Sequence, residues 1–256
     1  MLPVRLLLTT CLWLPVAALA CNYTYPVAPN QPALYQQAAS GEESGLMVVV
    51  AQRLATLSGC RLQPQQLPLA RRDAVFRSGQ LMLQLGVLED PQIPAADAEF
   101  VPMLRMALRV GVLRGGAYST ADEALADIST RLGMIRGTHL APTVTTRLNA
   151  LSVFSRIEYS NDRSSLYQKL ARQRLSAVLD TTSWAPTGVS GLEGQLQRLP
   201  FRPPLYVRVG SYLSTRLPAT DRQHLRRALQ QLVAEDALRP LIQTYLAIPA
   251  SDLLLP

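Results

Sequence analysis

The chain has 256 residues, 48% of them hydrophobic, and a formal net charge of +7. This length is sufficient for one large domain or for two modest lobes. The basic residues are spread along the sequence, with no run longer than the pairs Arg71-Arg72 and Arg226-Arg227 and without interleaved aromatic residues. That distribution disfavours a nucleic-acid-binding protein.

The N-terminus has the three regions of a secretory signal peptide. Arg5 precedes an apolar run at residues 6–14, and Ala18 and Ala20 supply small residues before Cys21. We therefore predict that residues 1–20 form a signal peptide, with cleavage before Cys21 and export of the protein to the periplasm. Lipid anchoring at Cys21 is the less favoured alternative, because Leu19 stands two residues before that cysteine and not three. No other segment is apolar over the length of a transmembrane helix.

The rest of the chain alternates between strand and helix patterns. Strands are expected at residues 21–25, 61–67 and 81–87, and helices at 46–58, which Gly59 ends, and at 71–78. A further apolar strand is expected at residues 104–113. This alternation is typical of an α/β protein.

The second half continues the same pattern. Thr120 and Glu123 form a capping box for a helix at residues 121–129, and a helix at 161–173 follows. Residues 205–209 form another apolar strand. Thr220 is expected to cap a final amphipathic helix, with apolar residues on one stripe.

Two segments of the sequence resemble those of a known protein family. Residues 131–138, RLGMIRGT, predict a short apolar strand that breaks at Gly137-Thr138 and enters a helix. Residues 171–180, ARQRLSAVLD, predict the end of a helix and then a buried strand closed by Asp180. Together they resemble the second lobe of the bacterial extracellular solute-binding proteins of family 3. These proteins deliver amino acids and similar small polar solutes to importers.

The resemblance implies a two-lobed, type II periplasmic-binding-protein fold, in which each lobe is a mostly parallel sheet flanked by helices. We expect the first lobe at residues 21–108 and 206–256 and the second at residues 112–200. Crossing strands are expected near 104–113 and 205–209. In this family the first two strands are neighbours, so Cys21 and Cys60 would lie about 5 Å apart and could form a disulfide. Two unpaired thiols are the alternative.

The resemblance also implies a ligand site between the lobes, because ligands of open α/β sheets bind beyond the carboxyl ends of the strands. Thr138 would offer its hydroxyl and a helix N-terminus to an anionic group, and Asp180 would hold an ammonium group. Tyr25 would stack on the solute, and Arg71 or Arg72 would face the cleft. A structural salt bridge for Asp180 and core packing for Tyr25 are the alternatives.

One expected ligand residue of the family is missing. Amino-acid receptors of this family carry an arginine after the strand near residue 81, which binds the α-carboxylate of the solute. Here residues 88–94, LEDPQIP, contain no arginine. Its replacement could be Arg71, Arg72, Arg105 or Arg109.

The resemblance implies a monomeric periplasmic receptor that captures a small polar solute for the membrane permease of an ABC-type importer. No catalytic motif, metal-ligand spacing or cofactor-binding motif is present, so we expect neither an enzyme, a bound metal nor a cofactor. The alternatives are a ligand-sensing partner of a signalling protein and a periplasmic enzyme on the same fold, such as a dehydratase.

Overall fold

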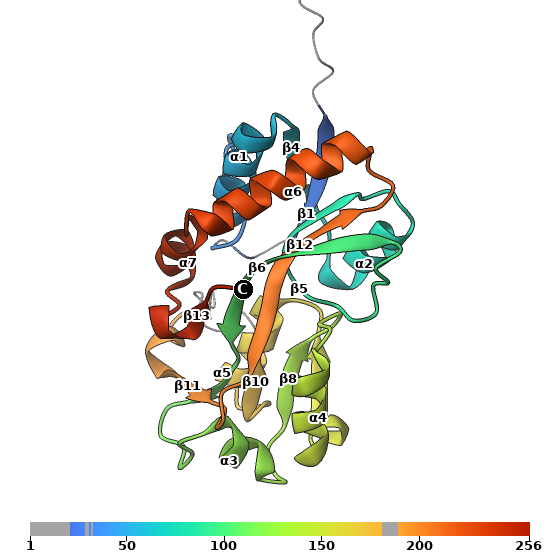
Figure 1. Ribbon diagram of the computed structural model, residues 1–256. Helices are drawn as coiled ribbons and strands as arrows, with labels where there is room; N and C mark the ends of the chain where they lie inside the picture. The colour runs from blue at the N-terminus through green and yellow to red at the C-terminus, as the bar shows by residue number, and fades with distance from the viewer. Residues whose placement is uncertain (1–20, 29–30, 32, 181–188) are drawn as a thin grey trace, which may run out of the picture.

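The protein folds into two lobes that are joined by two neighbouring passages of the chain (Figure 1). The computed structural model describes residues 21–28, 31, 33–180 and 189–256. The predicted signal peptide, residues 1–20, lies outside this range. No helix among the described residues is both long enough and apolar enough to cross a lipid bilayer.

Among the described residues, the upper lobe of Figure 1 has two main sheets, a short two-stranded hairpin and four helices. One sheet is the parallel pair β1 and β4, and the other has the order β13-β6-β12-β5 with antiparallel neighbours throughout. The strands are β1 (Asn22–Val27), β4 (Arg61–Gln66), β5 (Leu83–Leu88), β6 (Ala98–Ala107), β12 (Tyr206–Ser214) and β13 (Leu253–Leu254). The helices are α1 (Leu46–Ser58), α2 (Leu69–Arg77), α6 (Ala219–Ala234) and α7 (Leu238–Leu246).

The lower lobe is built on one five-stranded sheet of order β11-β7-β10-β8-β9. Its strands are β7 (Arg109–Leu113), β8 (Leu132–Ile135), β9 (Ile157–Ser160), β10 (Ala177–Leu179) and β11 (Leu196–Pro200). Its helices are α3 (Ala121–Ala126), α4 (Pro142–Ala150) and α5 (Arg163–Ala171). Strands β8, β9 and β10 run parallel, whereas β7 is antiparallel to both of its neighbours.

The remaining regular elements are short. They are the hairpin β2 (Gln36–Gln37) and β3 (Glu43–Ser44), and the 3₁₀ turns η1 (Phe154–Arg156), η2 (Glu193–Gln195) and η3 (Ala250–Asp252).

The chain passes between the lobes at Leu108 and again at residues 201–205. Leu108 separates β6 from β7, so the apolar run expected as one strand at 104–113 is two strands in different sheets. The backbone N–H of Leu108 donates to the carbonyl of Leu205 at 2.8 Å, which ties the two passages together. The Arg202–Pro203 peptide bond on the second passage is cis.

Sequence patterns locate most helices, and local chemistry sets their ends. The capping box of Thr120 and Glu123 is present at the start of α3. Helix α6 begins earlier than expected, after Pro218, so the prediction that Thr220 caps it is wrong. Proline at this position fixes its own φ near the helical value, although it offers no side chain to accept a hydrogen bond.

Mostly parallel sheets are present only in part. The parallel pairs are β1 with β4 and the three strands β8, β9 and β10. The four-stranded sheet of the upper lobe is antiparallel because the chain leaves this lobe through β6 and re-enters it through β12, directly beside β6 (Figure 1). Two passages through one hinge must run in opposite directions.

Candidate functional site

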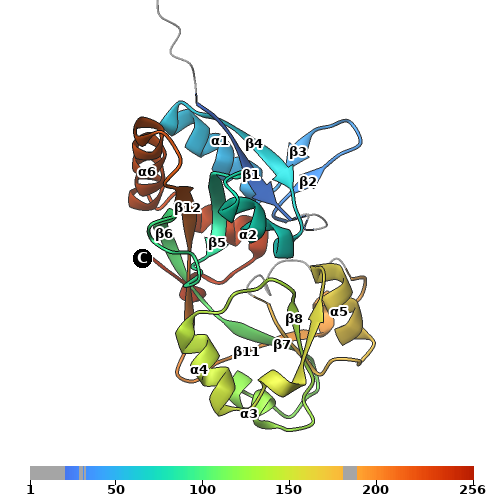
Figure 2. The same cartoon turned by 90° about the vertical axis from the view of Figure 1, so that its right-hand side faces the viewer.

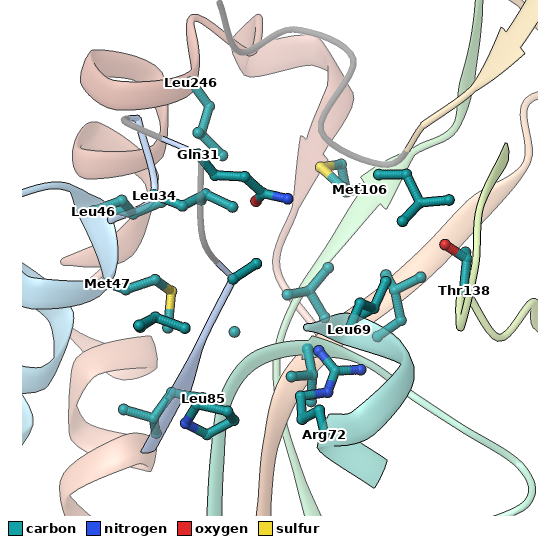
Figure 3. Close-up of a pocket in the computed structure, with 18 of the residues that line it drawn as sticks. Gln31, Leu34, Leu46, Met47, Leu69, Arg72, Leu85, Met106, Thr138 and Leu246 are labelled. Atoms are coloured by element: carbon teal, nitrogen blue, oxygen red, sulfur yellow. The ribbon is translucent and has the colours of Figure 1, made fainter. Parts of the chain in front are cut away.

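A cavity of about 210 Å³ lies between the lobes and extends into the upper one. Residues from both lobes line it, so its shape depends on how the lobes sit together. From the upper lobe come the end of β1, α1, the start of α2, β5, β6 and α7. From the lower lobe come the segments that follow β8 and β10. Figure 3 shows side chains of both lobes directed into the same space.

Most of the lining is apolar. The exceptions among the described lining residues, apart from two glycines, are Gln31, Arg72, Asp90, Thr138, His139 and Asp180. Five of these six, all except Gln31, come from α2, from the loop after β5 and from the lower lobe, whereas the other lining residues are mostly leucine, valine, isoleucine and methionine. The cavity is therefore an apolar chamber with a polar mouth.

Asp180 lies at the mouth, directly after β10, as expected for a residue beyond a strand end. Its carboxylate is almost completely buried and accepts a hydrogen bond from Nε of Arg163 at 2.8 Å. Arg163 is the first residue of α5 and its guanidinium packs 4.7 Å from the ring centre of Tyr167. The negative charge of Asp180 thus has a positive partner inside the lower lobe.

Thr138 also lines the cavity, and Figure 3 shows its hydroxyl facing the space. It does not open a helix, however, because α4 begins at Pro142, with Ala141 at the N-cap. Pro142 sets that start, since proline is favoured in the first helical turn and cannot sit further inside. The prediction of an anion site at a helix start by Thr138 is therefore wrong, while its hydroxyl remains available in the cleft.

The three predicted residues of the upper lobe have different positions. Arg72 of α2 lines the cavity, and its Nε donates to Asp73 Oδ1 at 3.2 Å. Arg71, its neighbour, is exposed and is not a lining residue. Tyr25 is buried in the core of the upper lobe, where burial raises the pKa of its hydroxyl above the ordinary value. Pro26 and Val27, and not Tyr25, line the cavity.

The two other candidates for the missing arginine lie away from the cavity lining. Arg109 of β7 forms an ion pair with Asp252 at the C-terminal end of the chain. Arg105 lies on β6 and is exposed. Arg72 is therefore the one arginine of the four candidates that reaches the mouth of the chamber.

A cluster of Asp73, Asp90 and His139 at the same mouth is absent from the sequence predictions. His139, from the lower lobe, has Nε2 at 3.2 Å from Asp73 Oδ2 and Nδ1 at 3.8 Å from Asp90 Oδ2. Both aspartates are buried and belong to the upper lobe, Asp73 on α2 and Asp90 after β5. The signal that could have found Asp90 and His139 is the one that found Asp180, a polar residue shortly after a strand.

These three residues are also the described group closest to a metal-binding set, with one ligand-type atom from each within 4.8 Å of the others. A zinc ion holds nitrogen and oxygen ligands at about 2.0–2.2 Å, so the three side chains would have to draw together to bind one. The Arg72 guanidinium already supplies a positive charge to Asp73. The arrangement fits a polar contact between the lobes.

A second contact between the lobes is made by backbone atoms. Gly137 has φ +86°, and a Cβ atom there would lie 2.8 Å from the Cα of Ala70 on α2. Glycine is required both by the left-handed conformation and by this close approach. The loop after β8 therefore lies directly against the start of α2. Figure 2 shows α2 of the upper lobe above β8 of the lower one.

Cys21 and Cys60 lie side by side at the starts of β1 and β4, with 4.6 Å between their Cα atoms and their sulfur atoms within bonding distance. The strands are parallel neighbours, as expected, with Asn22 opposite Arg61. The pair lies at the end of these strands opposite to Pro26 and Val27, which line the cavity.

The sequence matches no protein-family model and no curated protein. Among solved structures, the arginine-, lysine-, histidine-binding protein of the thermophilic bacterium Geobacillus stearothermophilus has a TM-score of 0.70 at 11% identity, over 90% of this chain and 98% of that one. A histidine kinase sensor domain similar to periplasmic binding proteins has a TM-score of 0.71 at 12% identity, covering 93% and 99%.

An ancestral amino-acid-binding protein, described as a precursor of cyclohexadienyl dehydratase, has a TM-score of 0.69 at 12% identity, with 88% of this chain and 95% of that chain covered. At these identities the similarity concerns the fold. The expected two-lobed α/β fold of the periplasmic binding proteins is confirmed.

Proposed function

We propose that this protein is a periplasmic solute-binding protein of the family 3 type, which binds a small solute between its lobes and presents it to the permease of an importer. The observation that carries the proposal is the cavity lined from both lobes, beside a hinge made of two tied passages. Lobes connected in this way can close on a ligand by rotation about the hinge. The amino-acid-binding proteins among the structural neighbours support the same function.

Thr138, Arg72 and Asp180 remain our proposed ligand residues from the sequence, joined by Asp90 and His139. Tyr25 and Arg71 have no direct path to the solute, since one is buried beneath the lining and the other is exposed. We propose for Tyr25 a role in supporting the end of β1, where Pro26 and Val27 meet the solute.

Catalysis is the competing function on this fold. His139 and Asp90 are acid–base groups that line the cavity, but His139 contacts Asp73 and Asp90 across the lobes at 3.2 and 3.8 Å. The third such group, Asp180, pairs with Arg163. We therefore propose binding without turnover. A sensing protein and a transport protein would bind the solute in the same cleft and differ only in their protein partner. Identification of that partner as a permease or as a sensor kinase therefore distinguishes the two functions.

The test is a thermal-shift screen of the purified protein against amino acids, amines, polyamines, sugars and small carboxylates, followed by calorimetry on the hits. The proposal predicts a raised melting temperature with at least one class and one binding site per chain. Incubation of each hit with the protein, followed by mass analysis of the solute, should show it unchanged. Conversion of the solute, or no binding by any class, would refute the proposal.

A further inference from the structure

The upper part of the cavity is a chamber of apolar side chains, deeper than a site for a wholly polar solute requires. Its walls include Leu46, Met47 and Val50 of α1, Met103 of β6, and Ile242 and Leu246 of α7. Figure 3 shows Leu46, Met47 and Leu246 on the same side of the space. Apart from the amide of Gln31, these walls offer a polar solute no hydrogen bonds in exchange for its water, which is costly. An apolar group would gain free energy in proportion to its buried surface.

The chamber exists because the sheet of the upper lobe is divided. β1 and β5 lie beside each other, but among the described residues no hydrogen-bonded ladder joins them. The carbonyls of Cys21 and Val27 accept from Arg61 of β4 and from Leu67 directly after it, so the alternate residues of β1, including Pro26, have their backbone polar groups towards β5. Proline has no N–H to donate, which weakens a ladder at this point. The ends of the two strands then flank the chamber.

The charges at the mouth leave one carboxylate without a cationic partner of its own. Arg72 pairs with Asp73 and Arg163 pairs with Asp180. Among the described residues Asp90 has only the imidazole of His139, at 3.8 Å, which carries a positive charge only when protonated. The mouth therefore favours a ligand group that is positively charged.

Asp90 is also held in place for such a group. Its backbone N–H donates to the Tyr212 hydroxyl at 2.7 Å, that hydroxyl donates to its carbonyl at 3.0 Å, and its Oδ1 accepts from the N–H of Gln92 at 2.9 Å. Its Oδ2 is buried and has no hydrogen-bond partner among the described residues. A buried carboxylate oxygen without a donor is costly, so a bound donor would gain that free energy.

Resting on the proposed function, we infer that the solute is a compact primary amine with an apolar body. Its ammonium group donates to Asp90 Oδ2 at the mouth, and its hydrocarbon part lies in the chamber. A cavity of about 210 Å³ has room for a body somewhat larger than benzene, which binds in an engineered apolar cavity of about 150 Å³.

The test is isothermal titration calorimetry of the purified protein with matched probes. 3-Methylbutylamine carries both features, 4-methylpentanoate keeps the body with an acidic end, and putrescine keeps the amine but ends in a second charge. The inference predicts that the first binds at least about tenfold more tightly than the other two, because a charge-assisted contact or an apolar contact is lost in each. Along straight-chain amines from ethylamine to pentylamine, affinity should rise about fourfold per methylene group.

Asp90→Asn tests the position of the ammonium group. Asparagine keeps the side-chain oxygen that accepts from Gln92, so the loop should stay in place, and the affinity for 3-methylbutylamine should fall at least about tenfold. Asp97→Asn removes the same charge from an exposed position of the same lobe and should change affinity less than about twofold. Melting temperatures of both variants confirm that they are folded.

Every other result of these titrations contradicts a specific part of the inference. Equal binding of 4-methylpentanoate, or leucine binding more than about tenfold tighter than the amine, would show that a carboxylate is the recognised end. Equal binding of putrescine would overturn the apolar body. Failure of every amine, while another class in the screen binds, would overturn this inference and leave the proposed function intact. Failure of every class would overturn both.

Discussion

At the scale of the residue, Asp180 and Arg163 form an ion pair whose two side chains are only 3% and 5% exposed. Removing the charge of one partner takes a buried charge-assisted contact away from the other. We expect Asp180→Asn to lower the free energy of unfolding by about 3 kcal/mol, measured by urea denaturation. Glu158→Gln breaks the exposed pair with Lys169 and should cost less than about 1 kcal/mol. Equal losses in the two variants would show that the Asp180 pair is not a buried structural contact.

Gly137 brings the backbone of the lower lobe close to Ala70 of the upper lobe. Gly137→Ala should cost about 1–2 kcal/mol of stability for its left-handed φ and, in addition, should push α2 away and weaken solute affinity about tenfold. Gly115→Ala is the matched control, since Gly115 has φ +95° with no atom within 4 Å of the added Cβ.

Calorimetry with the tightest solute from the screen separates the two glycine variants. Gly115→Ala should lose stability only, with its affinity unchanged. Equal affinities in both variants would show that the contact of Gly137 with Ala70 does not matter for the closed cleft.

Single residues also show what sequence alone can supply at this scale. The rule that polar residues beyond strand ends face a cleft located Thr138 and Asp180, which both line the cavity. The same rule could not tell that Arg163 neutralises Asp180, because the two residues are brought together only by the packing of α5 on β10. The rule also could not distinguish Arg72 from Arg71. The two are consecutive residues of α2, so their side chains point in different directions around the helix, and only Arg71 is exposed.

At the scale of the element, the pairing of β1 with β4 brings Cys21 and Cys60 together. We predict that the exported protein carries a disulfide here, which closes a segment with a sequence separation of 39. Its loss in a Cys21→Ser/Cys60→Ser variant should lower the free energy of unfolding by about 4 kcal/mol in the chain-entropy model.

Intact mass of the exported protein separates the alternatives for Cys21. A disulfide predicts cleavage before Cys21 and no mass increase on treatment with a thiol-alkylating reagent unless the protein is first reduced. Alkylation without reduction, or the added mass of a lipid, would contradict it. The single Cys21→Ser variant should lose as much stability as the double variant.

The C-terminal end of α3 has an acidic group that links stability to pH. The pKa of Asp127 is lowered to about 2 by hydrogen bonds from the Tyr118 hydroxyl and from Ser129. The unfolded value is about 3.9, so this contribution is complete above about pH 5 and is lost as the pH falls through about 2. Asp127→Asn should therefore lower the melting temperature clearly at pH 7 and much less at pH 2. An equal loss at pH 7 and at pH 2 would contradict this origin.

Elements whose limits depend on local chemistry were the most predictable. The capping box at Thr120 and the glycine that ends α1 satisfy backbone groups within a few residues, so the sequence contains the whole signal. The division of residues 98–113 into β6 and β7 does not appear in the sequence, because both strands are apolar and only the hinge at Leu108 separates them. Such a break depends on which sheet each half joins.

At the scale of the whole molecule, the two-lobed fold could be predicted from the family resemblance and the alternation of strands and helices, whereas the chamber could not. Its walls come from residues as distant as Pro26 and Leu246. A buried apolar stripe on a helix has the same pattern whether it meets another side chain or an empty space. The space opens because β1 and β5 do not pair. Pro26 weakens that pairing only because its nitrogen faces β5, and the sequence does not show which way the nitrogen faces.

The central claim is that one solute is bound between the two lobes. Hydrogen–deuterium exchange of the protein, with and without the tightest solute from the screen, tests it most directly. The account predicts slower exchange in peptides covering residues 85–90 of the upper lobe and 135–139 of the lower lobe together, with no change in α3. Protection confined to one lobe, or located away from both segments, would contradict it.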